Sequence, residues 1–298
     1  MPPNLKTPRP SRPPRHHHHH HQPRPSPTHF LCIPLVTSSS RPQLSRSISA
    51  FRSDVCGPLG FGIPEGAVRP LGTLHLTLGV FSFSGKGRGE GRQGEGGERK
   101  GEESKGEEGR DESKGEGGQE KGLEAAVQVL KGLRLKEILA GVKMPVMPGT
   151  TAAEGQGKGL DGEGEKLKVT FRGLRSMQTD KEKATVLYAP PEDPLGRLQG
   201  FCEGVKKVFV EEGVMAEEGR PLLLHATVVN TVYVKGKGGR RGERVTVDAR
   251  EVLEKYEDEV WMEDVEVEGV QICKMGAKKI VVDGEEDEAY EVEAEVRF

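Results

Sequence analysis

Hydrophobic residues recur along the chain with two periods, and each period predicts one type of element. A spacing of three or four positions connects four apolar residues, Leu44, Ile48, Phe51 and Val55. This spacing predicts a helix with one apolar face, with Pro42 in its first turn and Gly57 just beyond its end. Elsewhere, apolar runs of strand length stand between segments that are rich in glycine, proline and charge.

The same reasoning, applied to the whole chain, predicts both the elements and their order. We expect strands at 30–36, 74–83, 167–174, 184–189, 222–233, 265–273, 279–282 and 290–298. We expect helices at 41–55, 123–139, 194–209 and 252–261. The strands 167–174 and 184–189 are interpreted as two strands of one sheet, and the acidic stretch 285–288 as a turn without a binding role.

The unit of strand, helix and strand occurs twice in this order, which predicts an internal duplication. The fold class that follows is α+β. Two antiparallel sheets with flanking helices would form two lobes that face each other across a central cleft.

Three segments have compositions that cannot build a core. Residues 1–27 are rich in proline and arginine and contain six consecutive histidines, His16 to His21, which are either native or a tag. Residues 84–122 and 145–165 are rich in glycine and charge. Such segments bury too little apolar surface to offset their chain entropy, so we expect a disordered tail and two disordered insertions in one domain, 28–298.

Composition and charge limit the possible partners and the compartment. The formal net charge is −3, so no global field attracts nucleic acid or an anionic membrane. The four cysteines are scattered without a C-x-x-C pair, which favours a reducing, intracellular compartment in the nucleus or the cytoplasm. No apolar run approaches the length of about 20 residues that a membrane helix needs, so no membrane association is expected.

Two short segments, Leu74–Leu78 (LHLTL) and Leu224–Val228 (LHATV), carry the candidate chemistry. Each places a histidine and a threonine two positions apart in a predicted strand, so both side chains project to one face of a sheet. A single such pair is most often structural, but two pairs in corresponding places of a repeated unit favour function. The pairs are His75 with Thr77 and His225 with Thr227.

Facing imidazoles suit acid–base chemistry at a phosphate. One histidine can act as general base on water while the other acts as general acid on the leaving group, because the ordinary pKa of histidine lies near neutrality. The threonine hydroxyls can stabilise charge on the non-bridging phosphate oxygens. Neither a cofactor nor a metal is expected to be needed. His29 has no threonine partner and is expected to be structural. After the second motif, Tyr233, Lys235, Arg240 and Arg241 could contact a nucleotide or a phosphate, but a basic hairpin such as 235–244 is more often solvated, so these residues stay outside the predicted site.

Three stretches resemble a known family: THFL at 28–31, RPLGTLHLT at 69–77 and LHATVVNT at 224–231. They are similar to the 2H phosphoesterase superfamily, and within it to the A-kinase anchor protein-like domain that also occurs in a subunit of the activating signal cointegrator complex. The resemblance covers about 28–298 and implies a bilobal LigT-like fold. It also implies hydrolysis of cyclic or 2′,5′-linked nucleotide phosphodiesters, often at RNA ends, with His75, Thr77, His225 and Thr227 as catalytic residues.

The sequence therefore predicts an enzyme, a metal-independent phosphodiesterase that acts as a monomer on a nucleotide or an RNA end. A non-catalytic adaptor, which binds RNA or protein in a transcription-coactivator or DNA-repair complex, stays open as the alternative. Anchoring of a kinase regulatory subunit is a third option. It requires an exposed amphipathic helix, and each predicted helix is already needed to cover a sheet.

Overall fold

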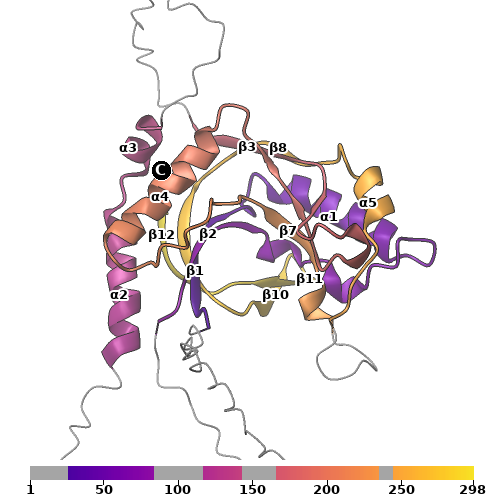
Figure 1. The fold of residues 1–298 in the computed structure, drawn as a ribbon, viewed down its shortest axis with the longest axis horizontal. Coiled ribbons are helices and arrows are strands. Elements are labelled where there is room, and N and C mark those ends of the chain that lie inside the picture. Colours follow the sequence, from indigo (N-terminus) through magenta and orange to yellow (C-terminus); the bar gives the residue numbers. More distant parts are fainter. Residues whose placement is uncertain (1–25, 84–116, 143–165, 235–243) are drawn as a thin grey trace, which may run out of the picture.

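The computed structural model describes residues 26–83, 117–142, 166–234 and 244–298 (Figure 1). Almost all of the predicted tail and most of both predicted insertions lie outside the described residues, as does nearly all of the basic hairpin. The expected domain organisation and the expected disorder therefore stay predictions.

A seven-stranded sheet, in which every neighbouring pair is antiparallel, forms the centre of the fold. Its spatial order is β12 (Val292–Arg297), β9 (Gly269–Lys274), β1 (His29–Pro34), β2 (His75–Phe81), β7 (Ala226–Asn230), β5 (Val186–Ala189) and β4 (Arg175–Ser176). The strand that contains His75 and the strand that contains Thr227 are direct neighbours in this sheet.

Two smaller sheets complete the β-structure. One holds β6 (Pro191–Glu192), β3 (Lys168–Arg172) and β8 (Val260–Glu266), and the other is the hairpin of β10 (Lys278–Val282) and β11 (Glu285–Ala289). The prediction that 167–174 and 184–189 share a sheet is wrong, because β3 and β5 lie in different sheets. Strand β3 pairs instead with β8, which contains buried residues of its own. The alternation of apolar and polar residues within one strand cannot predict a partner so far away in the sequence.

The acidic stretch 285–288 is a strand and not the predicted turn. The turn lies one step earlier, at Asp283 and Gly284, which both have positive φ (53° and 86°). Two consecutive residues of this kind are typical of the tightest hairpin connections, for which Asp-Gly is a preferred sequence. The run of carboxylates obscured this Asp-Gly pair.

Helices cover the sheets in two groups. On one half, α2 (Gly117–Gly132) packs on β12 and β9, while α4 (Arg197–Glu211) packs on β2 and also contacts α2 and the short α3 (Leu135–Ala140) (Figure 1). On the other half, α1 (Arg41–Cys56) packs on β8, and α5 (Arg250–Lys255) is short. The predicted apolar face of α1 is confirmed as buried, whereas the single helix expected at 123–139 is two helices, α2 and α3.

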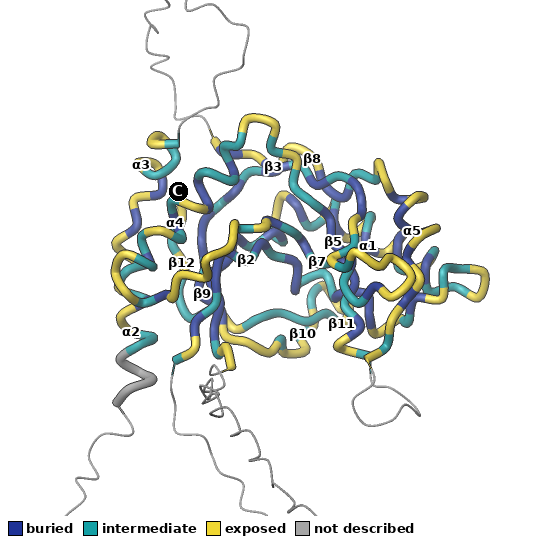
Figure 2. The backbone as a smooth tube through the Cα atoms, in the orientation of Figure 1, coloured by how far each residue is buried: buried dark blue, intermediate teal, exposed yellow. Residues whose placement is uncertain are grey.

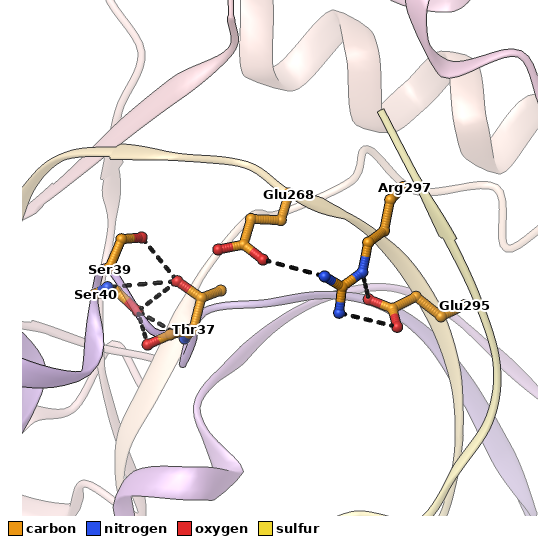
Figure 3. Close-up of polar contacts among 6 residues, drawn as sticks. All are labelled: Thr37, Ser39, Ser40, Glu268, Glu295 and Arg297. Carbon is orange, nitrogen blue, oxygen red and sulfur yellow. Dashed lines mark hydrogen bonds and ion pairs between the residues drawn. The ribbon is translucent and has the colours of Figure 1, made fainter.

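Polar contacts restrain the start of α1 and the strand β12 (Figure 3). The backbone N–H of Thr37 donates to Ser40 Oγ at 2.8 Å, and that hydroxyl donates to the carbonyl of Leu35 just after β1. At the other end, Arg297 of β12 pairs with Glu295 (2.9 Å) and Glu268 (3.8 Å). Both contacts tie strand ends of the seven-stranded sheet to the segments beside them.

Buried residues follow the strands of the sheets and the inner faces of the helices (Figure 2). Trp261, Phe51 and Phe171 are among the largest side chains in this core. The predicted α+β class with antiparallel sheets is thus confirmed, while the duplication into two lobes stays a prediction. Among the described residues, no helix is both long and apolar enough to cross a bilayer.

Candidate active site

The two His-x-Thr segments lie side by side in the seven-stranded sheet. Leu76 of the first motif pairs with Ala226 of the second in antiparallel register. Continued by one residue in each direction, this register sets His75 opposite Thr227 and Thr77 opposite His225. An antiparallel pair has local twofold symmetry, so an axis through the Leu76–Ala226 pair relates one motif to the other. The structure thus brings together the four residues that the sequence predicts.

Burial alternates in the same way along both motifs. The middle residues Leu76 and Ala226 are buried, at 0% and 5% exposure, while each histidine and each threonine is partly exposed. This alternation follows from the pleat of the strand, which sends the apolar residue into the core and the two polar residues to the other face. One shared face therefore holds two imidazoles and two hydroxyls.

The second motif departs from the prediction at its ends. His225 directly precedes β7, and residues 231–233 form a one-turn 3₁₀ helix, so the strand expected over 222–233 is shorter. Asn230 ends it, because its side-chain oxygen accepts a hydrogen bond from the backbone N–H of Val232 at 3.1 Å. This is the local capping that asparagine offers in competition with strand pairing.

Both imidazoles are held in the same way by the backbone two residues earlier. His75 Nδ1 lies 2.8 Å from the carbonyl of Thr73, and His225 Nδ1 lies 2.9 Å from the carbonyl of Leu223. Because a carbonyl oxygen only accepts, Nδ1 carries a proton in each ring. Nε2 is then the nitrogen left for chemistry, and in His75 it lies 3.0 Å from Thr77 Oγ1.

Aromatic rings pack on both histidines, more closely on the first. His75 contacts Phe30 (ring centroids 4.7 Å apart) and the edge of Tyr290 (5.3 Å). His225 contacts the edge of Tyr188 at 5.4 Å. Burial lowers the pKa of His75 to about 4, and the neighbouring His225 and Arg69 act in the same direction, against the hydrogen bond that Nδ1 donates to the carbonyl of Thr73. His75 is therefore a neutral imidazole at neutral pH.

Arg69 and Tyr290 are site residues that the sequence reasoning missed, and Tyr233 was set aside as solvated. The Arg69 guanidinium stacks over the Tyr233 ring at 3.8 Å, and Tyr290 neighbours both. Arg69 begins one of the stretches that carry the family resemblance, but its position in the site depends on the neighbouring Val68–Val229 bridge and on its own N–H bond to Val228 (2.8 Å). Both contacts are long-range.

The segment that leads into the first motif is anchored from the far end of the chain. Asp287 of β11 accepts the backbone N–H of Gly72 at 3.0 and 3.1 Å, and Arg41 pairs with the same carboxylate at 3.3 Å. A Cβ on Gly72 would lie 2.5 Å from the carbonyl of Glu288, so the close approach of this hairpin requires glycine. The anchored segment includes Thr73, whose carbonyl orients His75.

The third histidine lies in other surroundings, and no metal site is apparent. His29 is 3% exposed, contacts Phe83 and lies 3.6 Å from Glu293, with neither motif among its partners. This burial agrees with the structural role expected for it. Across the described residues, no group of three or more histidine, cysteine or acidic side chains is arranged to hold a metal ion.

Part of the chain is similar to a family of known proteins. Residues 154–298 match the family described as the AKAP7 2′5′ RNA ligase-like domain, and this range contains His225 and Thr227. This match confirms the resemblance drawn from the sequence over this range. The first motif lies before the matched range, so its place in the site depends on the pairing of β2 with β7.

Two curated relatives match shorter stretches. An uncharacterized protein of Schizosaccharomyces pombe is 29% identical over 113 residues, which are 38% of this chain and 51% of the relative. Activating signal cointegrator 1 complex subunit 1 of Mus musculus is 31% identical over 110 residues, which are 32% of this chain and 31% of the relative. The matched stretches thus span about half of the first relative and about a third of the second.

Solved structures align over most of the chain at low similarity. The crystal structure of a phosphoesterase gives a TM-score of 0.40 at 11% identity and covers 91% of this chain and 97% of that one. The structure of E. coli LigT complexed with 3′-AMP gives 0.37 at 10% identity, with 91% and 96% covered. At TM-scores this low we draw no conclusion about function from either.

Proposed function

We propose that the site is the catalytic centre of a metal-independent phosphodiesterase acting on cyclic or 2′,5′-linked phosphodiesters of nucleotides or RNA ends. The observation that carries this proposal is the register of β2 and β7, which sets two imidazoles and two hydroxyls around one local twofold axis. The family match over residues 154–298 supports the substrate class.

The burial of His75 favours a division of roles between the two rings. His75 is neutral, with its proton on Nδ1, so Nε2 offers a lone pair and acts as general base on water. As the water oxygen bonds to phosphorus, His75 Nε2 takes the proton. The bond from phosphorus to the 2′-oxygen breaks, and His225 Nε2–H donates a proton to that leaving oxygen. Protons balance, because one enters at His75 and one leaves at His225.

The threonines stabilise charge where it develops. Thr77 and Thr227 flank the imidazoles on the same face, so their hydroxyls can donate to the two non-bridging oxygens of the phosphate. Thr77 contacts His75 Nε2 at 3.0 Å in the ligand-free protein, and a bound phosphate would draw that hydroxyl toward its own oxygen.

Turnover of defined substrates tests the proposal. The wild type is incubated with 2′,3′-cyclic nucleotides and with 2′,5′-oligoadenylate, and His225→Ala serves as the matched variant. We expect hydrolysis by the wild type and a loss of about 10²- to 10⁴-fold in the variant, the usual contribution of one proton-transfer group. Equal rates in the two proteins would exclude the assigned role. Binding of oligonucleotide without turnover would favour an adaptor instead.

Membership of a coactivator complex and a nuclear location belong to the same proposal. They are supported by the 31% identical stretch of the cointegrator complex subunit and by the family match. Copurification of the tagged full chain with cointegrator subunits from nuclear extract would test both. Isolation of the chain alone would count against them.

A further inference from the structure

Arg69 is a buried cation that has no anionic partner among the residues that the structure describes. The residue is 5% exposed, and within the described part of the chain no carboxylate pairs with its guanidinium. Arginine is rarely this buried unless it is paired, because removing a charge from water costs several kcal/mol. Arg41 shows the usual arrangement, in which a partly buried guanidinium meets a carboxylate, Asp287. An unpaired guanidinium near the imidazole of His75 therefore points to an anion that is not part of the protein.

Two tyrosines hold the guanidinium in place without neutralising its charge. The carbon of the guanidinium lies 3.8 Å from the ring centre of Tyr233, so one face of the planar group is covered. Tyr290 is the second neighbour: burial and the adjacent Tyr233 raise its pKa to about 12, against the opposing effect of Arg69, so its phenol is neutral at neutral pH. One side-chain hydrogen bond joins Tyr290 to Arg69, and because a guanidinium carries five N–H donors, others can still bind a ligand.

Arg69 is connected to both motifs through single contacts. Its backbone N–H donates to the carbonyl of Val228 at 2.8 Å, the residue directly after Thr227. Tyr290, its neighbour, lies against the ring of His75 with centroids 5.3 Å apart. Arg52 of α1 also donates to the carbonyl of Arg69, at 3.4 Å, which fixes the backbone from the other side. These contacts restrain the backbone of Arg69 and position its guanidinium on the face of the sheet that the two motifs share.

We propose that the Arg69 guanidinium binds the phosphate group of the substrate through two parallel hydrogen bonds, and that Tyr233 and Tyr290 are the positioning residues that orient it. The ligand class is a tetrahedral oxyanion. The inference deepens the proposed function and rests on it only for the identity of this oxyanion as a phosphodiester. Because guanidinium does not titrate in the working range, it supplies a permanent positive charge where His75 is neutral.

The affinity for sulfate measures anion binding by Arg69 independently of turnover. Sulfate is tetrahedral and keeps its charge from mildly acid to mildly alkaline pH, so its affinity can be measured by calorimetry without any reaction. We expect Arg69→Ala to weaken sulfate binding by about 10-fold or more, since charge-assisted hydrogen bonds are lost. Arg134→Ala is the matched control: it removes the same charge from an exposed residue paired with Glu137, and we expect unchanged affinity.

A second variant keeps the inference testable if Arg69→Ala does not fold. Arg69→Lys keeps the charge but not the planar fork, so we expect sulfate affinity below that of the wild type. For the wild type we expect affinity to persist at mildly alkaline pH. Sulfate binding equal to that of the wild type in the folded Arg69 variants, or an equal loss in Arg134→Ala, would overturn the inference.

The outcomes also separate this inference from the proposed function. Loss of sulfate binding in Arg69→Ala, together with no turnover by the wild type, would retain the anion site and reject the phosphodiesterase. Turnover by the wild type, together with unchanged sulfate binding in Arg69→Ala, would retain the phosphodiesterase and reject the anion site.

Discussion

The first motif lies against two aromatic rings and near a buried arginine, whereas the second lies at the exposed beginning of its strand, beside one tyrosine. Both motifs nevertheless share their backbone register, their alternation of burial and the carbonyl that fixes Nδ1. Local geometry is therefore duplicated, and the surroundings are not. Phe30 and Tyr290 contact the ring of His75, and Arg69 helps to lower the pKa of this ring.

This difference teaches that the tautomer and the protonation of a histidine have separate origins. The tautomer follows from a contact two residues away, so it is the same in both motifs. Protonation follows from burial and from charges contributed by distant strands, so it can differ. A symmetric pair of motifs can in this way perform an asymmetric reaction, with one neutral base and one acid.

The largest expected effect comes from replacing each histidine and then changing the leaving group. We expect His75→Asn and His225→Asn each to lose about 10²- to 10⁴-fold in kcat on a 2′,3′-cyclic nucleotide. A phosphodiester with a good leaving group, such as a 4-nitrophenyl ester, needs no acid. It should restore turnover by at least about 10-fold in His225→Asn and much less in His75→Asn.

The measurement is kcat for both substrates in the two variants and the wild type. Equal rescue of both variants would contradict the assignment of His75 as base. Rescue confined to His75→Asn would reverse the two roles.

Acid stability gives the next effect. Folding lowers the pKa of His75 from the ordinary 6.5 to about 4, so the unfolded chain takes up this proton first as the pH falls. The contribution of His75 to stability is complete above pH 6.5 and is lost as the pH falls towards 4, by about 3 kcal/mol at about 1.4 kcal/mol per pKa unit. His29, whose pKa burial also lowers, acts in the same direction.

Urea unfolding of the wild type and of His75→Asn across this window measures the effect. We expect the variant to lose less stability than the wild type between neutral and acid pH. The same comparison above pH 7, where His75 is neutral in both states, is the control. Parallel losses at acid pH would show that the first motif is not the more strongly perturbed one.

The smallest expected difference is between the two threonines. Removing either donor, as Thr77→Val or Thr227→Val, should lower kcat by about 10²-fold, the scale of one lost oxyanion contact. Thr77 alone contacts an imidazole, at 3.0 Å from His75 Nε2, so only Thr77→Val should also move the acid limb of the pH–rate profile. A shift of the acid limb in Thr227→Val, or no shift in Thr77→Val, would contradict this difference between the two threonines.

The sequence predicted what depends on local pattern. The apolar spacing of α1, the strand at 75–81 and the pairing of each histidine with its threonine could all be inferred from alternation and periodicity. The sequence Asp283-Gly284 also indicates a turn, but the turn was predicted at the neighbouring acidic residues 285–288 instead.

Features that depend on long-range contacts were not predictable in this way. Strands β3 and β5 resemble each other locally, and only their partners separate them into two sheets. Arg69 joins the site because its segment bridges β7, and Tyr290 joins because the β10–β11 hairpin delivers it to His75. A single arginine or tyrosine has no periodic pattern, so the hydrophobic periodicity did not assign either residue to the site.

The hydrogen bonds between Gly72 and Asp287 join residues 215 positions apart, which has a consequence for how the protein is made. On the ribosome, the loop before His75 leaves the exit tunnel long before the hairpin that restrains it. A shortened product that ends before β11 would contain both His-x-Thr motifs but would lack the hydrogen bonds from Gly72 to Asp287, which restrain the segment before His75. Contacts of such span also delay folding. The loop before His75 therefore gains this restraint only after Asp287 has been synthesised.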